Sequence, residues 1–181
     1  IIGPLGNGFN ESGDDKLRRY PLLIAGGMGV APLVFLAQRL AYSVERIGYR
    51  KNKKFELSAK VLIGAKTKSR IICEKEFKNL GCDVKIATDD GSLGFKGKVT
   101  ELLRRELSAI RYPLSAIYAC GPKLMLKELS KIAKAKNIPA QVSLEAHLSC
   151  GIGACLGCVV ETKSGAKRVC KDGPVFRADE I

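Results

Sequence analysis

Short apolar runs alternate with amphipathic stretches between residues 20 and 144, and this alternation restricts the possible folds more than any other feature of the chain. Most of the apolar runs are rich in Val, Ile or Leu, as central strands of a parallel sheet are. The expected strands are residues 20–25, 59–64, 83–88, 115–119 and 140–144. The expected helices are residues 32–47, 71–80, 98–107 and 123–136. This order predicts an α/β fold with a five-stranded parallel, doubly wound sheet.

The pattern breaks after the fifth expected strand. Residues 150–158 are dense in Gly and Cys and too irregular for either a helix or a strand. A chain of 181 residues is long enough for one substantial core and a small appendage. We therefore expect a nucleotide-binding domain over residues 1–145 and a small Cys-rich lobe over residues 146–181.

The composition argues against membrane and nucleic-acid partners. No stretch approaches the roughly 20 apolar residues that span a bilayer, and the first residues lack the pattern of a secretory signal. The net charge is +13, but the aromatic residues, only 6% of the chain, do not form the regular interleaving that a stacking platform requires. We interpret the basic runs at residues 46–54 and 123–136 as one polar loop and a solvated helix face. The expected protein is soluble and cytoplasmic.

The cysteines carry the strongest chemical signal. Cys150, Cys155 and Cys158 lie within nine residues, and Cys170 follows. The spacing C-x4-C-x2-C with a more distant fourth Cys is that of plant-type 2Fe-2S ligation, and soft thiolates suit iron. Glycines between the ligands let a short loop wrap closely around a cluster. The short return from Cys158 to Cys170 predicts a hairpin with its turn at residues 164–165.

A structural zinc site with four cysteine ligands is the competing interpretation. Zinc sites typically present two C-x2-C units, and this segment has one, so the spacing favours iron and sulfide. His147 lies three residues before the first ligand, but a Rieske-type cluster needs two histidines and the chain has one. Cys73 and Cys82 stand beside apolar residues, and we interpret both as small buried thiols.

A glycine-rich turn follows the first expected strand, at the edge where open parallel sheets bind their ligands. Small residues there let backbone N–H groups approach a phosphate, and Pro32 suits the first turn of a helix. Because Pro32 occupies the third glycine position of G-x-G-x-x-G and no acidic residue ends the second strand, a turn without a ligand stays open as an alternative. The candidate residues are Gly26, Gly27, Met28, Gly29, Val30, Ala31 and Pro32.

The loop after the third expected strand carries two carboxylates. Asp89 and Asp90 could accept hydrogen bonds from a ribose, but an Asp-Gly turn is equally compatible with a solvent-exposed loop. Their charge would repel a 2′-phosphate, whereas Lys66 and Lys68 would attract one. The residues alone therefore leave NAD and NADP both possible.

The loop after the fourth expected strand contains Cys120, Gly121 and Pro122. A thiol at the carboxyl end of a strand faces the ligand crevice, where it can pack on a nicotinamide ring. The alternative is a buried cysteine that simply ends a strand.

Several motifs together resemble one family. GPLGNGF, LLIAGGMGVAP, DDGSLGFKGKVT, YACGPKLML, CGIGACLGC and KDGPVF are similar to the electron-transfer subunits of NAD-dependent, two-subunit dihydroorotate dehydrogenases, members of the ferredoxin-reductase-like flavoprotein superfamily. The resemblance covers essentially the whole chain. CGIGACLGC with KDGPVF, and DDGSLGFKGKVT, are its most specific parts, whereas GGMGVAP and CGP occur more widely in the superfamily.

The resemblance implies a division of labour within pyrimidine biosynthesis. A partner subunit would oxidise dihydroorotate at FMN, and electrons would pass through the 2Fe-2S cluster held here to FAD and leave as hydride to NAD. Residues 26–32 would cradle the pyrophosphate, Asp89 and Asp90 would lie near the adenosine, and residues 120–122 would border the nicotinamide. Residues 3–9 would lie beside the flavin, most of whose contacts belong to an N-terminal barrel that this sequence lacks. We assign no catalytic residue and expect an oxidoreductase subunit that is inactive alone.

Two other functions stay open. Related FAD/2Fe-2S subunits pair NAD(P)H with ferredoxin or a sulfur compound, although the glycine pattern between Cys150 and Cys158 favours the dihydroorotate dehydrogenase family. The third possibility is a zinc-stabilised binding module without a redox role.

Overall fold

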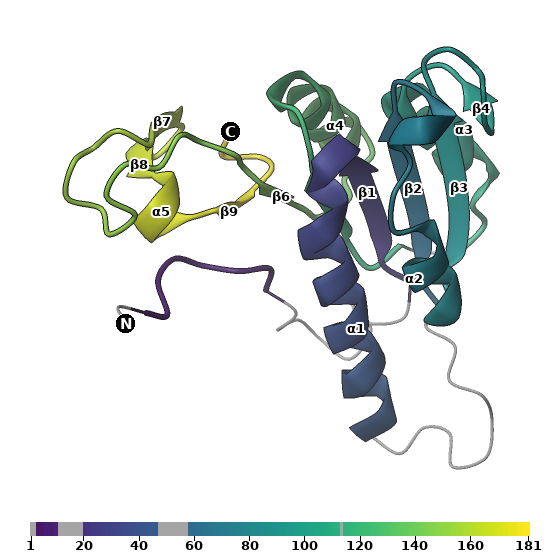
Figure 1. The fold of residues 1–181 in the computed structure, drawn as a ribbon, viewed down its shortest axis with the longest axis horizontal. Coiled ribbons are helices and arrows are strands. Elements are labelled where there is room, and N and C mark those ends of the chain that lie inside the picture. Colours follow the sequence, from purple (N-terminus) through teal and green to yellow (C-terminus); the bar gives the residue numbers. More distant parts are fainter. Residues whose placement is uncertain (1–2, 11–19, 47–57, 113) are drawn as a thin grey trace.

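The computed structural model describes residues 3–10, 20–46, 58–112 and 114–181. A seven-stranded sheet forms its centre, with the strand order β4-β3-β2-β1-β5-β6-β9 (Figure 1). All neighbouring strands in this sheet are parallel except β6 and β9. The strands are β1 (Leu22–Gly26), β2 (Lys60–Ala65), β3 (Asp83–Thr88), β4 (Phe95–Lys96), β5 (Ile117–Cys120), β6 (Ala140–Ser143) and β9 (Val175–Arg177).

The α/β prediction is confirmed, and the five expected strands are adjacent in the parallel part of the sheet, which β4 extends by one more parallel strand. Two strands were not predicted. The two-residue β4 is too short to give a periodic signal, and β9 returns from the Cys-rich segment to pair antiparallel with β6. The sheet is therefore mixed at one edge, and the C-terminal segment is part of it.

Helices cover both faces of the sheet, as predicted. They are α1 (Val30–Arg46), α2 (Glu74–Asn79), α3 (Val99–Ala109) and α4 (Lys123–Ala135). The second helix is shorter than expected, because a 3-10 turn at Lys68–Arg70 and an extended Ile71 precede it and Cys73 has a left-handed backbone. On α4 the lysines are exposed, which confirms the interpretation of that basic run as a solvated helix face; the run at residues 46–54 falls almost entirely outside the described residues.

Neighbouring residues of β1 point to opposite faces and divide the core in two. Leu23 packs with α1 and α2 in one apolar cluster, and Leu22 and Ile24 pack with α3 and α4 in the other. All three side chains are completely buried. Burying such a side chain stabilises the fold by about 1.5–3 kcal/mol, so β1 is the centre of the domain.

At the amino-terminal side of the sheet, one buried carboxylate pairs with two lysines. Glu106 of α3 accepts hydrogen bonds from Lys60 Nζ at 2.7 Å and from Lys85 Nζ at 2.9 Å. Burial raises the pKa of the Glu106 carboxyl, but the hydrogen bonds from the two lysines outweigh it and hold this pKa below its ordinary value. The network lies away from the edge where ligands are expected, and we assign it to stability.

The C-terminal segment forms a small lobe beside the sheet (Figure 1). Strands β7 (Val159–Thr162) and β8 (Gly165–Arg168) form the expected hairpin, followed by the short helix α5 (Val169–Asp172). Thr162 pairs with Gly165, so the turn is at residues 163–164, one position earlier than predicted. No helix within the described ranges is long and apolar enough to cross a membrane.

Candidate functional site

The strand order reverses between β1 and β5, which is where the ligand crevice is expected at the carboxyl edge of the sheet. From β1 the chain winds outward to β2 and β3, and it then crosses to the other side of β1 to form β5. Open α/β sheets bind ligands at such a reversal of strand order. The loops that follow β1 and β5 are residues 26–32 and 120–122, and the fold therefore brings the two predicted sets of nicotinamide-nucleotide residues together.

These two loops are in tight backbone contact. A Cβ on Gly29 would lie only 2.3 Å from the carbonyl oxygen of Cys120 and 2.7 Å from the Gly121 nitrogen. A Cβ on Gly26 would lie 2.8 Å from Pro122 Cδ, a ring atom that cannot rotate away, and 2.6 Å from Met125 Sδ, so glycine is required there too. Gly27 is required for a different reason, since its φ is +56° while nothing lies within 4 Å of its Cβ position. Chain packing alone thus explains two of the three glycines.

Cys120 ends β5 and is 3% exposed. Burial raises the pKa of its thiol, and a hydrogen bond with Ser143 at the end of β6 partly offsets that effect. The thiol is therefore neutral, and its place in the apolar cluster with Leu23 and Val30 agrees with the alternative of a buried cysteine that ends a strand. Because β6 runs parallel to β5, the chain leaves the sheet at this same edge before it enters the Cys-rich lobe.

Asp89 and Asp90 lie at the same edge but follow β3, which β2 separates from β1. Asp90 Oδ1 accepts hydrogen bonds from the backbone and the hydroxyl of Ser92, and these hydrogen bonds lower its pKa. Ser92 Oγ in turn accepts a hydrogen bond from the Lys68 backbone at 2.7 Å. The loops with the carboxylates and the lysines are thus joined, and β2 lies between β3, which the carboxylates follow, and β1, which residues 26–32 follow.

The four predicted ligand cysteines occupy three parts of the lobe. Cys150 and Cys155 are on one loop, Cys158 ends it, and Cys170 is on α5. Backbone N–H groups point at three of the sulfurs: Cys155 N to Cys150 Sγ, Gly157 N to Cys155 Sγ and Cys170 N to Cys158 Sγ, each at 3.4 Å. Such N–H···S hydrogen bonds stabilise thiolate charge, as a loop that holds iron–sulfur requires.

The cysteines interact as two pairs, Cys150 with Cys155 and Cys158 with Cys170. Backbone hydrogen bonds, first from Cys155 and then from Ile152, lower the pKa of Cys150 to about 6. The backbone N–H of Cys170 lowers the pKa of Cys158, whereas the hydrogen bond to Cys158 raises the pKa of Cys170. One thiol of each pair is thus disposed to ionise, and anionic thiolate is the form that binds metal.

This arrangement fits a two-iron cluster. In a 2Fe-2S cluster two bridged irons share four cysteines, so the ligands come as two pairs instead of converging on one point. The paired thiols and the N–H groups directed at sulfur are suited to that group.

The remaining cysteines and the histidine do not join this site. Burial raises the pKa of the Cys82 thiol to about 11. Cys73 is only half-buried, at the start of α2, so the expectation of a buried thiol holds for Cys82 but not for Cys73. His147 is exposed, as expected for a surface residue.

The N-terminal segment lies against the lobe and helps to form a cavity. Asn7 N donates to Gly173 O, and Val175 N donates to Asn7 O at 3.2 Å. The cavity, about 800 Å³, lies between residues 6–10, the hairpin and the paired strands β6 and β9. The segment that the resemblance places beside a flavin is thus one wall of a cavity next to the lobe.

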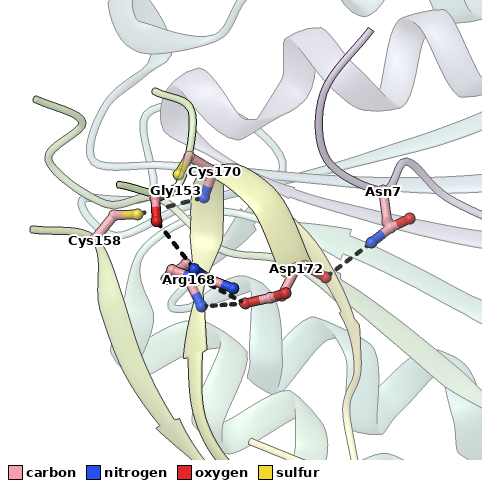
Figure 2. Close-up of polar contacts among 6 residues, drawn as sticks. All are labelled: Asn7, Gly153, Cys158, Arg168, Cys170 and Asp172. Carbon is pink, nitrogen blue, oxygen red and sulfur yellow. Dashed lines mark hydrogen bonds and ion pairs between the residues drawn. The ribbon is translucent and has the colours of Figure 1, made fainter. Parts of the chain in front are cut away.

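Two residues of the lobe were not predicted from the sequence. Arg168 donates from Nη1 to Gly153 O at 3.0 Å, and Asp172 Oδ2 accepts from Arg168 Nε (Figure 2). Their position next to Cys170 in the sequence was the available signal, but only the folded hairpin shows that Arg168 reaches the loop between Cys150 and Cys155.

Comparison with known families agrees with this geometry. The family described as "Oxidoreductase NAD-binding domain" matches residues 23–131, which contain the crevice between β1 and β5. The chain belongs to this family. Residues 145–181 match the family described as "Iron-sulfur cluster binding domain of dihydroorotate dehydrogenase B". The two matches support NAD and an iron–sulfur cluster as cofactors and confirm the resemblance that the motifs carry.

Curated relatives cover the entire chain. It is 40% identical to the "Dihydroorotate dehydrogenase B (NAD(+)), electron transfer subunit" of Desulforamulus reducens and 38% identical to that of Clostridium acetobutylicum. In both comparisons all of this chain is aligned, with 64% and 63% of the relative's length. The chain thus spans slightly less than two thirds of these relatives.

Solved structures confirm the ferredoxin-reductase-like fold. A structure of NADH-dependent reduced ferredoxin-NADP oxidoreductase is similar over 99% of this chain and 58% of its own, with a TM-score of 0.76 and 30% identity. A cytochrome P450 reductase from Amycolatopsis matches 74% of this chain and 39% of its own, with a TM-score of 0.55 at 20% identity, which shows the fold alone.

Proposed function

We propose that this chain is the electron-transfer part of an NAD-dependent dihydroorotate dehydrogenase. The observation that carries the proposal is the combination of full-chain identity of 36–41% to subunits of that name with four paired cysteines in the lobe. In the overall reaction dihydroorotate loses two electrons and two protons to become orotate, and NAD takes up both electrons and one proton. Oxidation of dihydroorotate belongs to a catalytic FMN subunit that pairs with this chain.

The two proposed parts, residues 1–145 and 146–181, divide this task. Cys150, Cys155, Cys158 and Cys170 hold the cluster, which supplies one-electron transfer when bound. Residues 26–32 and 120–122 bind and orient the nicotinamide nucleotide at the crevice between β1 and β5. The backbone of Gly29 packs directly against the carbonyl of Cys120, so the two loops are fixed close to each other at the end of the strands where the nucleotide would bind.

We propose that FAD, which couples single electrons to hydride transfer when bound, lies beside residues 6–9. The cavity along this segment supports that location, because it also contacts the lobe through Lys167 and Asp172. Flavin at this position would lie against the hairpin of the lobe and the strand pair β6–β9 at the edge of the sheet. Because all seven cysteines are free thiols, we also propose a cytoplasmic location, where thiolates stay reduced.

We propose NAD as the acceptor, with Asp89 and Asp90 near the adenosine ribose. Two exposed carboxylates at this edge disfavour a 2′-phosphate. The names of the relatives specify NAD(+) and support the same choice. Comparing rates with NAD and NADP tests this choice, and faster reduction of NADP would refute it.

The decisive experiment is reconstitution without oxygen. The full-length protein is purified with its catalytic subunit, and we expect two irons and two acid-labile sulfides per chain together with NADH formation that depends on dihydroorotate. One zinc per chain without sulfide would instead establish the zinc-stabilised module. Activity with reduced ferredoxin but not with dihydroorotate would move the assignment to the second candidate, which the similarity to the ferredoxin-NADP oxidoreductase supports.

A further inference from the structure

We propose that Arg168 is a positioning residue for the iron–sulfur site: it anchors the first ligand loop and supplies a positive charge that favours reduction of the cluster. The inference rests on the cluster proposed above. It extends that proposal, because it assigns to a residue that is not a ligand both a mechanical and an electrostatic role.

The anchoring role follows from the hydrogen bond to the loop. Arg168 Nη1 donates to the carbonyl of Gly153 at 3.0 Å, and Gly153 lies midway between Cys150 and Cys155 (Figure 2). Gly153 has φ of +83°, and its Cβ position lies 3.0 Å from the Lys171 side chain, so the loop is also packed against α5. The guanidinium therefore ties the loop that holds one cysteine pair to the hairpin that leads to the other.

Arg168 is itself fixed by Asp172. The carboxylate Oδ2 accepts from the Arg168 backbone at 2.8 Å and from Nε at 3.3 Å, and the Asp172 carbonyl accepts from Asn7 Nδ2 at 3.0 Å. Arg168 and Asp172 are 30% and 29% exposed, so the pair is shielded from full solvent screening. One continuous network joins residue 7, α5 and the cluster loop, as Figure 2 shows.

The electrostatic role follows from the charge of the cluster. On reduction the cluster gains one electron, and its negative charge grows by one. A guanidinium held against the ligand loop stabilises that added charge, whereas the Asp172 carboxylate opposes it. Removing the two charges one at a time must therefore shift the cluster potential in opposite directions. A purely structural pair would shift it in the same direction or not at all.

The first measurement is the reduction potential of the cluster in full-length protein, with electron paramagnetic resonance used to detect the reduced form. Arg168→Gln is expected to lower the reduced-to-oxidised ratio at a fixed potential roughly three- to tenfold, where tenfold is about 59 mV for one electron. Asp172→Asn, which keeps an acceptor for the backbone hydrogen bond, is expected to raise the ratio. Arg104→Gln is the control: it removes a guanidinium that pairs with Glu128 between α3 and α4, and it is expected to leave the reduced-to-oxidised ratio of the cluster unchanged.

The second measurement is amide hydrogen exchange of residues 150–158 in protein prepared without iron, so it does not depend on the cluster. Arg168→Gln is expected to accelerate exchange in this loop several-fold without changing exchange in β2. Lys171→Gln also removes a positive charge from the lobe but leaves the Gly153 carbonyl bonded to Arg168, and it is expected to leave loop exchange unchanged. Arg168→Lys is expected to keep the potential close to that of the wild type but to loosen the loop, because an ammonium group lacks the planar fork of donors.

The outcomes separate the two proposals. Wild-type protein that binds no 2Fe-2S cluster ends the proposed function, while the exchange experiment still tests the anchor. Equal loop exchange in Arg168→Gln and Lys171→Gln refutes the anchor, and potential shifts of the same sign in Arg168→Gln and Asp172→Asn refute the electrostatic role. If Arg168→Gln does not fold, Arg168→Lys and Asp172→Asn decide the two roles by the same criteria.

Discussion

The contact between the two loops of the crevice makes Gly29→Ala the sharpest test of the structure. The new methyl group would lie 2.3 Å from the Cys120 oxygen, 2.4 Å from its carbonyl carbon and 2.7 Å from the Gly121 nitrogen. Ordinary contacts begin at 3.4 Å, so the loops after β1 and β5 must separate by about 1 Å. All three opposing atoms belong to the backbone, and no side chain can rotate away.

Overpacking typically costs about 1–3 kcal/mol. Because only backbone atoms can move to relieve this contact, we expect Gly29→Ala to lower the free energy of unfolding by about 2–4 kcal/mol. For a chain of this size each kcal/mol lowers the melting temperature by about 2–4 °C. Since the same displacement widens the crevice between residues 26–32 and 120–122, we also expect weaker binding of NADH.

Gly27→Ala is the matched control in the same loop. Its methyl group meets nothing within 4 Å, but φ of +56° must be kept, which costs a non-glycine residue about 1–2 kcal/mol. Urea unfolding followed by circular dichroism measures both variants. Losses of equal size, or a larger loss for Gly27→Ala, would show that the two loops do not pack as described.

Three further predictions concern other parts of the molecule. Glu106→Gln is expected to lower the free energy of unfolding by about 2–4 kcal/mol at neutral pH, because Lys60 and Lys85 lose the charge of Glu106 and Lys60 keeps only the exposed Asp83, at 3.2 Å, as a partner. Since the pKa of Glu106 lies below 4.5 in the folded protein, the difference from wild type should fade as the pH falls through that lowered pKa, which urea titrations at several pH values measure. Cys155→Ser is expected to abolish the visible absorption of the cluster and to leave the circular dichroism of the α/β domain unchanged; full retention of absorption would mean that the ligand set is wrong. Asp90→Ala removes the acceptor for both Ser92 hydrogen bonds and is expected to weaken NADH binding, measured by calorimetric titration; unchanged affinity would place the adenosine elsewhere.

The alternation of strands and helices could be predicted from the sequence because it depends on local periodicity. Leu22, Leu23 and Ile24 form one apolar run, and such a run predicts a strand that is buried on both faces. The helix at Glu74–Asn79 was predicted too long because a left-handed residue, Cys73, interrupts a stretch whose apolar spacing continues. Backbone conformation of a single residue leaves little trace in periodicity.

That the four cysteines predicted as ligands share one lobe could also be anticipated, because the first three lie close together in the chain with a spacing typical of a cluster loop. The glycine-rich turn was predicted at the correct place but for an incomplete reason. Phosphate binding calls for a close backbone approach, whereas Gly29 is required first by its contact with Cys120, a residue far away in the sequence.

The sequence by itself therefore determined the α/β class, five strands of the sheet, the loops that follow β1 and β5, and the lobe that gathers the four cysteines, since each depends on residues that are neighbours along the chain. Only the tertiary structure decided that β9 joins β6, that Asp89 and Asp90 lie apart from residues 26–32, and that Arg168 bonds to the loop between Cys150 and Cys155. These pairings join distant residues through strand order and hairpin register, which local patterns of hydrophobicity and spacing do not encode.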